Sequence, residues 1–328
     1  MKLTLLYQSK GLAEREWIPD IFRAVAGEVV HDEKHEVVLD NCLLIDFFLH
    51  RRSDDYYAKF RGKNAWLFHI ADEAYDGGYD KYKYFRGVFR NHWSGIFNSR
   101  RVVQLPLGYT AGLPLQQNLP EASSRKYLWS FLGQARKSSR PEMAKAFQHL
   151  DNGFSLITDQ KDVKSLGKDG YYQVLRDSAF VPCPMGNVHL ESFRVYESIE
   201  CGAIPIIEKR WSLDYYRSLL GDHPLPTFTS WDRAAEFASA MHHDPAALNS
   251  LQAKCMQWWS EKKQSLRDRI AAFVASAPGD EAGPYYTWKH SLPGWQYTEL
   301  LRHHSAPAIA RRFKSQIQLL ASKGKMRR

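Results

Sequence analysis

The segment DSAFVPCPMGNVHLESFRVYESIECGAIPII, residues 177–207, decides the fold class. It predicts a strand that ends at Pro182 and a helix over residues 190–200, joined by a loop that contains Gly186. A second strand is predicted over residues 203–207, where β-branched side chains dominate. Strand, helix and strand in this order form one unit of a parallel sheet, and ligands of such sheets bind where a strand passes into its helix.

The same alternation of strands and helices extends along both halves of the chain. The first half predicts a helix over residues 17–25 and strands at residues 3–7, 37–39, 64–70 and 102–107. The second half predicts a helix beginning near Ser139, helices over residues 171–176 and 231–241, and strands at residues 126–132, 154–158, 179–182 and 226–228. We therefore expect an α/β protein with parallel sheets.

The length of 328 residues favours two domains. Glycine and proline residues between positions 106 and 120 form a connection rich in turn formers, and we place the domain boundary there. The expected division is a Rossmann-like domain over residues 1–118, a second one over residues 119–290, and a basic helical tail over residues 291–328 that crosses back to the first domain.

Composition favours a packed globular protein. Hydrophobic residues make up 44% of the chain and charged residues 25%, and no stretch approaches the roughly 20 apolar residues of a membrane span. The N-terminal residues MKLTLLYQSKG become polar too soon for a signal sequence, so we expect a cytoplasmic protein. The four cysteines are far apart and lack CxxC spacing, which indicates buried reduced thiols.

The net charge of +9 is concentrated at the C-terminus, because residues 301–328 hold eight Lys or Arg and no acid. The nearly balanced remainder argues against a nucleic-acid groove. Apolar residues recur at helical spacing in this tail, at Ile309, Phe313, Ile317 and Leu320. A basic amphipathic helix of this kind can bind anionic lipid, so we expect residues 307–328 to contact the inner membrane face peripherally. The alternative is a terminal helix that packs on the rest of the protein.

The predicted helix over residues 190–200 carries Glu191, Arg194 and Glu197 at intervals of three, which places them on one face. A guanidinium in this position can hold a diphosphate and stabilise it as a leaving group. A carboxylate one turn further can accept hydrogen bonds from ribose hydroxyls. The same spacing also fits an ion-pair ladder on a solvated helix.

The motif of residues 178–207, with Cys183, Gly186, Arg194, Glu197 and the sequence IPII, resembles the donor-binding motif of exostosin-like glycosyltransferases, including the ribitol xylosyltransferase branch. Further patches that resemble this family are LFHIADE (67–73), FRNHW (89–93), LPLGY (105–109) and RKYLWSFLGQARKSSRPEM (125–143). Together the patches cover about half of the chain.

The resemblance implies a GT-B fold, in which two Rossmann-like domains face a cleft. It also implies an inverting transfer from a nucleoside-diphosphate sugar, with UDP favoured, to a hydroxyl of a glycan or lipid-linked acceptor. A non-catalytic glycan- or nucleotide-binding protein of the same fold is the alternative. The donor-binding residues are then Gly133, Arg140, Cys183, Gly186, Glu191, Arg194 and Glu197.

An inverting enzyme needs a base that takes the proton of the acceptor hydroxyl. Asp72 and Glu73 follow the apolar strand at the expected cleft and are the first candidates, with His189 and Glu191 of the second domain as the alternatives. Asn91, His92 and Trp93 are expected to line the acceptor site, because amide and aromatic side chains suit sugar hydroxyls and sugar faces.

No convincing DxD motif is present, and enzymes of the GT-B fold generally do without a metal ion. We therefore expect neither a bound metal nor another cofactor. The chain also lacks GxxxxGK[ST], GxGxxG, GxSxG and HExxH. This argues against P-loop nucleoside triphosphatases, dinucleotide-binding enzymes, α/β-hydrolases and zinc proteases.

Overall fold

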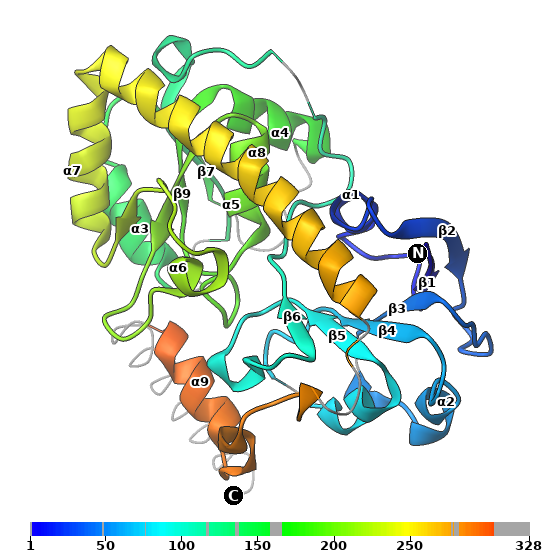
Figure 1. Cartoon of the computed structure of the whole chain (residues 1–328). Helices are drawn as coiled ribbons and strands as arrows, with labels where there is room; N and C mark the ends of the chain where they lie inside the picture. Colours follow the sequence, from blue (N-terminus) through cyan, green and yellow to red (C-terminus); the bar gives the residue numbers. More distant parts are fainter. Residues whose placement is uncertain are drawn as a thin grey trace, which may run out of the picture.

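The computed structural model describes residues 2–47, 49–75, 77–115, 118–134, 138–157, 166–276, 278 and 282–304. Within these residues the chain forms two parallel β-sheets, one in each half (Figure 1). The strand order is β2-β1-β3-β4-β5-β6 in the first sheet and β11-β10-β9-β7-β8 in the second. Helices flank both sheets, which confirms the predicted α/β class.

The first sheet is built from short, mostly buried strands. Its members are β1 (Leu3–Tyr7), β2 (Ala26–His31), β3 (Cys42–Asp46), β4 (Ala65–His69), β5 (Gly87–Arg90) and β6 (Val102–Gln104). The helices of this half are α1 (Trp17–Ile21) and α2 (Asp54–Ala58), with 3₁₀ turns η1 (Leu49–Arg51), η2 (Tyr79–Tyr84) and η3 (Gly95–Phe97). The central strands β3 and β4 are buried along their whole length, as expected for parallel strands covered on both faces.

Two sequence predictions in this half are wrong. Residues 37–39 form no strand, because the Asp32 carboxylate accepts the backbone N–H groups of Glu36 and Val37 (3.1 and 2.9 Å) and holds a turn. The helix predicted over residues 17–25 ends at Ile21. The strand that follows it, β2, is an exposed edge strand of sequence AGEVVH, which explains why no buried apolar pattern indicated it.

The second sheet agrees with the predicted strands to within one residue. It contains β7 (Tyr127–Gly133), β8 (Gly153–Ile157), β9 (Ser178–Cys183), β10 (Ile204–Glu208) and β11 (Thr227–Phe228). The helices around it are η4 (Ala122–Ser124), α3 (Arg140–Phe147), α4 (Gly167–Arg176), α5 (Phe193–Glu200), α6 (Tyr215–Leu220) and α7 (Trp231–His242).

Helix α5 begins at Phe193, three residues later than predicted, because residues 190–192 are not helical and Ser192 has an extended backbone. The backbone N–H of Leu190 donates to Nδ1 of His303 (3.1 Å), and its carbonyl accepts the hydroxyl of Tyr216 (3.1 Å). These contacts hold the segment before α5 away from helical geometry.

The long helix α8 (Pro245–Ser276) passes from the second sheet to the first (Figure 1). Trp259 stacks on Trp17 with 6.0 Å between ring centroids, and Arg267 forms an ion pair with Asp20 (2.8 Å). The return of the chain to the first domain thus begins in α8, well before the predicted tail.

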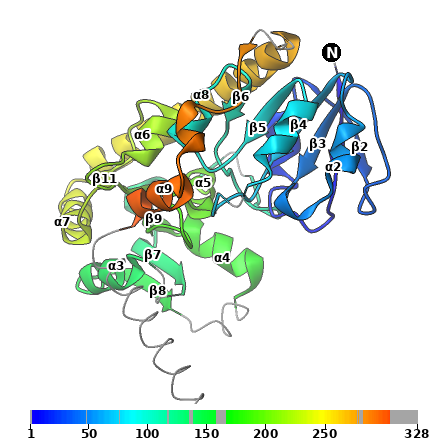
Figure 2. The same cartoon turned by 90° about the horizontal axis from the view of Figure 1, so that it is seen from below.

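The C-terminal part of the described chain contains η7 (Trp288–Ser291) and α9 (Trp295–His303), which contact both halves (Figure 2). The Ser94 hydroxyl donates to Glu299 (2.9 Å), whereas Arg210 donates to the carbonyl of His303 (2.8 Å). The predicted basic helix over residues 307–328 lies outside the described residues. Among the helices that are described, none is long and apolar enough to cross a bilayer.

Candidate active site

A cavity of about 780 Å³ lies between the two domains. The first domain contributes residues that follow β1 and β4, including Glu14 and Glu73. The second contributes Gly133 at the end of β7 and residues of α5. The carboxyl ends of parallel strands thus meet at this cavity, which is where α/β folds bind their ligands.

Two guanidinium groups form one wall of the cavity. Arg194 donates to the carbonyl of Leu132 (2.6 Å) and lies over the ring of Phe131, and Arg140 donates to the carbonyl of Gln134 (3.1 Å). Nε of each arginine is buried without a hydrogen-bond partner, and within the described part of the chain neither arginine forms an ion pair. Burial and the second guanidinium lower the pKa of Arg140 to about 10, with Glu208 and Glu73 offsetting part of the effect.

At Gly133 the backbone at the end of β7 lies close to the guanidinium of Arg194. Its φ is +151°, and a Cβ at this position would lie 3.1 Å from Nη2 of Arg194. A glycine here keeps the strand end accessible to a ligand phosphate. The structure therefore brings together three of the predicted donor-binding residues.

Glu197 lies on α5 and is almost completely buried at the cavity wall. Its two carboxylate oxygens accept the hydroxyls of Thr110 (2.6 Å) and Tyr171 (2.8 Å). Glu191 precedes α5 and is buried as well. The alternative of a solvated ion-pair ladder is therefore wrong, because both glutamates are buried and no ion pair joins either of them to Arg194 within the described residues.

Glu191 accepts three hydrogen bonds, one of which comes from the first domain. Its carboxylate accepts the backbone N–H of Leu107 (2.9 Å) and the hydroxyls of Tyr196 (2.5 Å) and Tyr215 (2.6 Å). Burial raises the pKa of Glu191 to about 7, although these donors act in the opposite direction.

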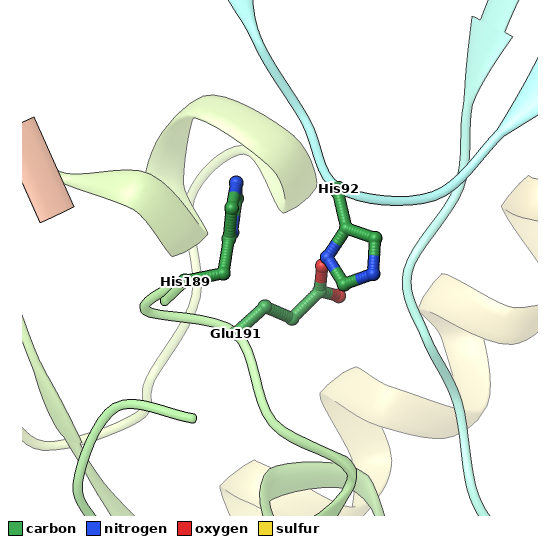
Figure 3. Close-up of side chains that lie close together, drawn as sticks. All are labelled: His92, His189 and Glu191. Carbon is green, nitrogen blue, oxygen red and sulfur yellow. The ribbon is translucent and has the colours of Figure 1, made fainter. Parts of the chain in front are cut away.

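His92 and His189 lie beside Glu191 (Figure 3). Ligand atoms of the three residues all lie within 4.8 Å of one another, so they could hold a metal ion. Three donors already occupy the Glu191 carboxylate, which leaves it little capacity for a cation. His189 also shares a hydrogen bond with the hydroxyl of Tyr75 (2.8 Å), and burial lowers its pKa well below the usual value.

Three of the candidate bases have different surroundings. Asp72 is buried and accepts Arg90 (3.0 Å) and Tyr79 (2.8 Å), and it does not line the cavity. Glu73 lines the cavity and accepts the backbone N–H groups of Asn187 and Val188 in the second domain (3.2 Å each). His189 lies behind the cavity wall, against the ring of His303.

Of the three predicted acceptor residues, His92 lines the cavity, whereas Asn91 and Trp93 do not. The side-chain oxygen of Asn91 accepts the backbone N–H of Ala71 (3.1 Å), and the backbone N–H of Trp93 donates to the hydroxyl of Tyr215 (2.8 Å). His92 has a left-handed backbone (φ +58°), and burial lowers its pKa to about 3, so the imidazole at the cavity is neutral.

Gly186 and Cys183, two of the predicted donor-binding residues, differ in their position relative to the cavity. Gly186 lines the cavity, and a Cβ there would lie 2.9 Å from the carbonyl oxygen of Glu191, too close for any other residue. Cys183 is buried below the loop, where its thiol donates to the carbonyl of Val181 (3.2 Å). Burial raises the pKa of this thiol to about 12, so it is not a thiolate near neutral pH.

Residues 113–277, half of the chain, match the family described as RXYLT1 C-terminal domain. The chain belongs to this family. The match covers the second sheet and α8, and it confirms the resemblance to exostosin-like glycosyltransferases. The protein is thus a glycosyltransferase.

Solved structures share the fold of this RXYLT1-family chain. The crystal structure of an alpha1,3-fucosyltransferase is 12% identical with a TM-score of 0.52, covering 87% of this chain and 92% of that one. This similarity confirms the GT-B fold. Anabaena Alr3699/HepE in complex with UDP and glucose is 11% identical with a TM-score of 0.49, covering 84% of this chain and 100% of that one. No curated protein matches the chain.

Sequence reasoning missed one carboxylate of the RXYLT1-family site. Glu14 lies in the turn between β1 and α1, is 6% exposed and lines the cavity. It belongs to none of the patches that resemble the family. Its place after the first strand of a parallel sheet was the only available signal.

Proposed function

We propose that this glycosyltransferase transfers a sugar, with inversion, from a nucleoside-diphosphate sugar to a hydroxyl of a glycan or lipid-linked acceptor. UDP is the expected nucleotide. The observation that carries the proposal is the pair Arg140 and Arg194, two guanidinium groups at the end of β7 without an ion-pair partner in the described chain. A diphosphate supplies the missing negative charge, and the two arginines stabilise it as it leaves.

The ribose is proposed to bind at Glu197. A carboxylate oxygen has two lone pairs, so Glu197 can accept ribose hydroxyls in addition to Thr110 and Tyr171. Gly133 and Gly186 let the ligand approach the backbone. Cys183 and Glu191 flank the loop that contains Gly186 and are proposed to support it.

Glu73 is the proposed base. Its carboxylate lines the cavity and is near enough to Arg140 to influence the pKa of that residue. The acceptor oxygen attacks the anomeric carbon, its proton passes to Glu73, and the bond from that carbon to the diphosphate oxygen breaks on the opposite side. Asp72 and His189 remain alternatives, and Asn91 and Trp93 are proposed to support the acceptor side through His92.

Metal-independent catalysis is part of the proposal, because two guanidinium groups can provide the positive charge that a divalent cation would supply. Turnover that survives dialysis against EDTA would support it. Full loss, restored by a divalent cation, would direct attention to the cluster of His92, His189 and Glu191.

Residues 307–328 are proposed to contact the anionic inner face of the membrane from the cytoplasmic side. Exposed aromatic side chains close to the last described residues support the proposal. Trp211 is fully exposed and follows Arg210, which donates to the carbonyl of His303, and Tyr297 on α9 is 75% exposed. Co-sedimentation with phosphatidylserine vesicles, compared with phosphatidylcholine vesicles and with a chain ending at residue 304, tests this contact.

The experiment that tests the function is a thermal-shift and hydrolysis screen against UDP-, GDP-, ADP- and CMP-sugars. One donor should stabilise the wild type, and Arg194→Ala and Glu197→Ala should remove the stabilisation. Arg233→Ala, which removes an exposed ion pair with Glu236 on α7, is the control. Binding without turnover would favour the non-catalytic alternative, and no response to any donor would contradict the proposal.

A further inference from the structure

Glu14 is a buried carboxylate that the fold does not use. Its side chain lines the cavity from the turn after β1, although the residue is only 6% exposed. Apart from its own backbone amide, no hydrogen-bond donor or ion-pair partner reaches the carboxylate from the described residues. Burial raises the pKa of Glu14 above its usual value, and its own amide offsets part of this effect.

Three other acids in the described chain, in contrast, have partners. Glu16, two residues later and exposed, accepts the backbone N–H of Gly112 (2.9 Å). Asp20 forms an ion pair with Arg267, and Glu197 accepts two hydroxyls. A buried carboxylate whose only donor is its own backbone amide costs stability, so a position that serves only the fold would favour a neutral residue.

The turn that carries Glu14 is fixed in place. The backbone N–H of Ala111 donates to the carbonyl of Ala13 (2.8 Å), which connects the turn to the segment that carries Thr110. Lys168 also lines the cavity, but it donates to the carbonyl of Ala111 (2.9 Å) and forms no ion pair with Glu14. Glu14 is therefore a positioned acceptor on the wall of the first domain, without a cation to neutralise it.

The chemistry of this group selects its ligand. An ionised carboxylate can only accept hydrogen bonds, so the ligand must present donors. Phosphates are excluded because they are anionic acceptors, and the arginines that suit them lie at the end of β7 on the wall of the second domain. Sugar hydroxyls are the donors that a glycosyltransferase brings into this cavity.

We propose that Glu14 binds substrate by accepting a hydrogen bond from a sugar hydroxyl held in the cavity. This inference rests on the proposed function and adds a specificity-determining residue from the first domain. The hydroxyl belongs either to the nucleotide-sugar donor or to the acceptor sugar, and the two sources give different results below. A site with a buried acceptor strongly rejects an analogue that lacks the matching hydroxyl.

The test compares Glu14→Gln and Glu14→Ala with the wild type and with Glu16→Gln, which makes the same charge change two residues away. Thermal unfolding at pH 7.5 is measured first, without ligand. Glu14→Gln should raise Tm by about 2 °C, because it removes a buried charge that has no partner. If Glu14 instead stabilised the fold, Glu14→Gln would lower Tm.

Affinity for UDP and for UDP-glucose, UDP-galactose and UDP-xylose is measured next, followed by transfer to free pentoses, hexoses and glycerol in competition with hydrolysis. A loss of affinity for a UDP-sugar of about tenfold or more assigns the hydroxyl to the donor. A fall of similar size in the ratio of transfer to hydrolysis, or a matching rise in acceptor KM, assigns it to the acceptor.

The inference is overturned if Glu14→Gln lowers Tm, or if donor affinity and the transfer ratio both stay within twofold of the wild type. A wild type that binds no nucleotide-sugar overturns the proposed function, and the assignment of a sugar hydroxyl with it. The first failure lies in the variant and the second in the wild type, so the two are distinguishable.

Discussion

Arg90 in the first domain and Arg194 in the second both lie near strand ends, but their surroundings differ. Arg90 is fully buried, forms an ion pair with Asp72 (3.0 Å) and lies 3.6 Å above the ring of Phe97. The Arg194 guanidinium donates to a carbonyl and lies over an aromatic face, and its Nε has no hydrogen-bond partner among the described residues. A buried charge with a counter-charge holds a fold together, whereas one without it indicates a binding site for an anion.

The largest expected effect concerns Arg90, the buried arginine that has a counter-charge. Asp72→Ala leaves Arg90 buried without its carboxylate and should lower the free energy of unfolding by about 3–5 kcal/mol. Urea denaturation measures the loss. Asp222→Ala, which breaks an exposed pair with Arg217, should produce no measurable change. Equal behaviour of the two variants would mean that the Asp72–Arg90 pair does not stabilise the fold.

The second effect should appear in binding and not in folding. Arg194→Ala removes a guanidinium that repels Arg140, so the free energy of unfolding should stay within about 1 kcal/mol of the wild type. Affinity for UDP should fall by about 10- to 100-fold in calorimetric titration. A stability loss as large as that of Asp72→Ala would place Arg194 in the same structural class as Arg90 and remove the contrast.

The third expected effect concerns pH. The folded-state pKa of Glu191 is about 7, above the unfolded value of about 4.3. Its contribution to stability is therefore complete below about pH 4.3 and is lost as pH rises toward 7, at about 1.4 kcal/mol per pKa unit.

Glu191→Gln does not titrate, so the stability deficit of this variant should be larger at pH 5 than at pH 8. Denaturation of both proteins at the two pH values gives the difference. A deficit that is the same at both pH values would indicate that the three donors, and not burial, control this carboxylate.

The second domain could be predicted well because its strands are continuous apolar runs and its donor motif resembles a known family. All five of its strands lie within one residue of the predicted positions. The edge strand β2 could not be predicted, since its side chains are mostly exposed and carry no apolar pattern. Helix α8 was missed because its 32 residues contact both domains, and no single apolar face marks it as a helix.

The site was predicted only where a motif pointed to it. Gly133, Arg140, Gly186, Arg194 and Glu197 were predicted together and lie on one cavity. Glu14, which no motif indicated, comes from the first domain, and tertiary packing brings it to that cavity. Local sequence could not distinguish Glu14 from Glu16, because only burial separates the two.

Translation produces the first sheet before the second domain, yet residues that complete the hydrophobic core of that sheet follow the second domain in the sequence. Tyr285 and Trp295 belong to that core, and Phe273 of α8 contacts Phe89 of β5. While the ribosome translates the second domain, these apolar surfaces have no cover, which makes the nascent N-terminal half a natural client for chaperones. A stop codon near position 270 would therefore impair the half of the protein that was translated first.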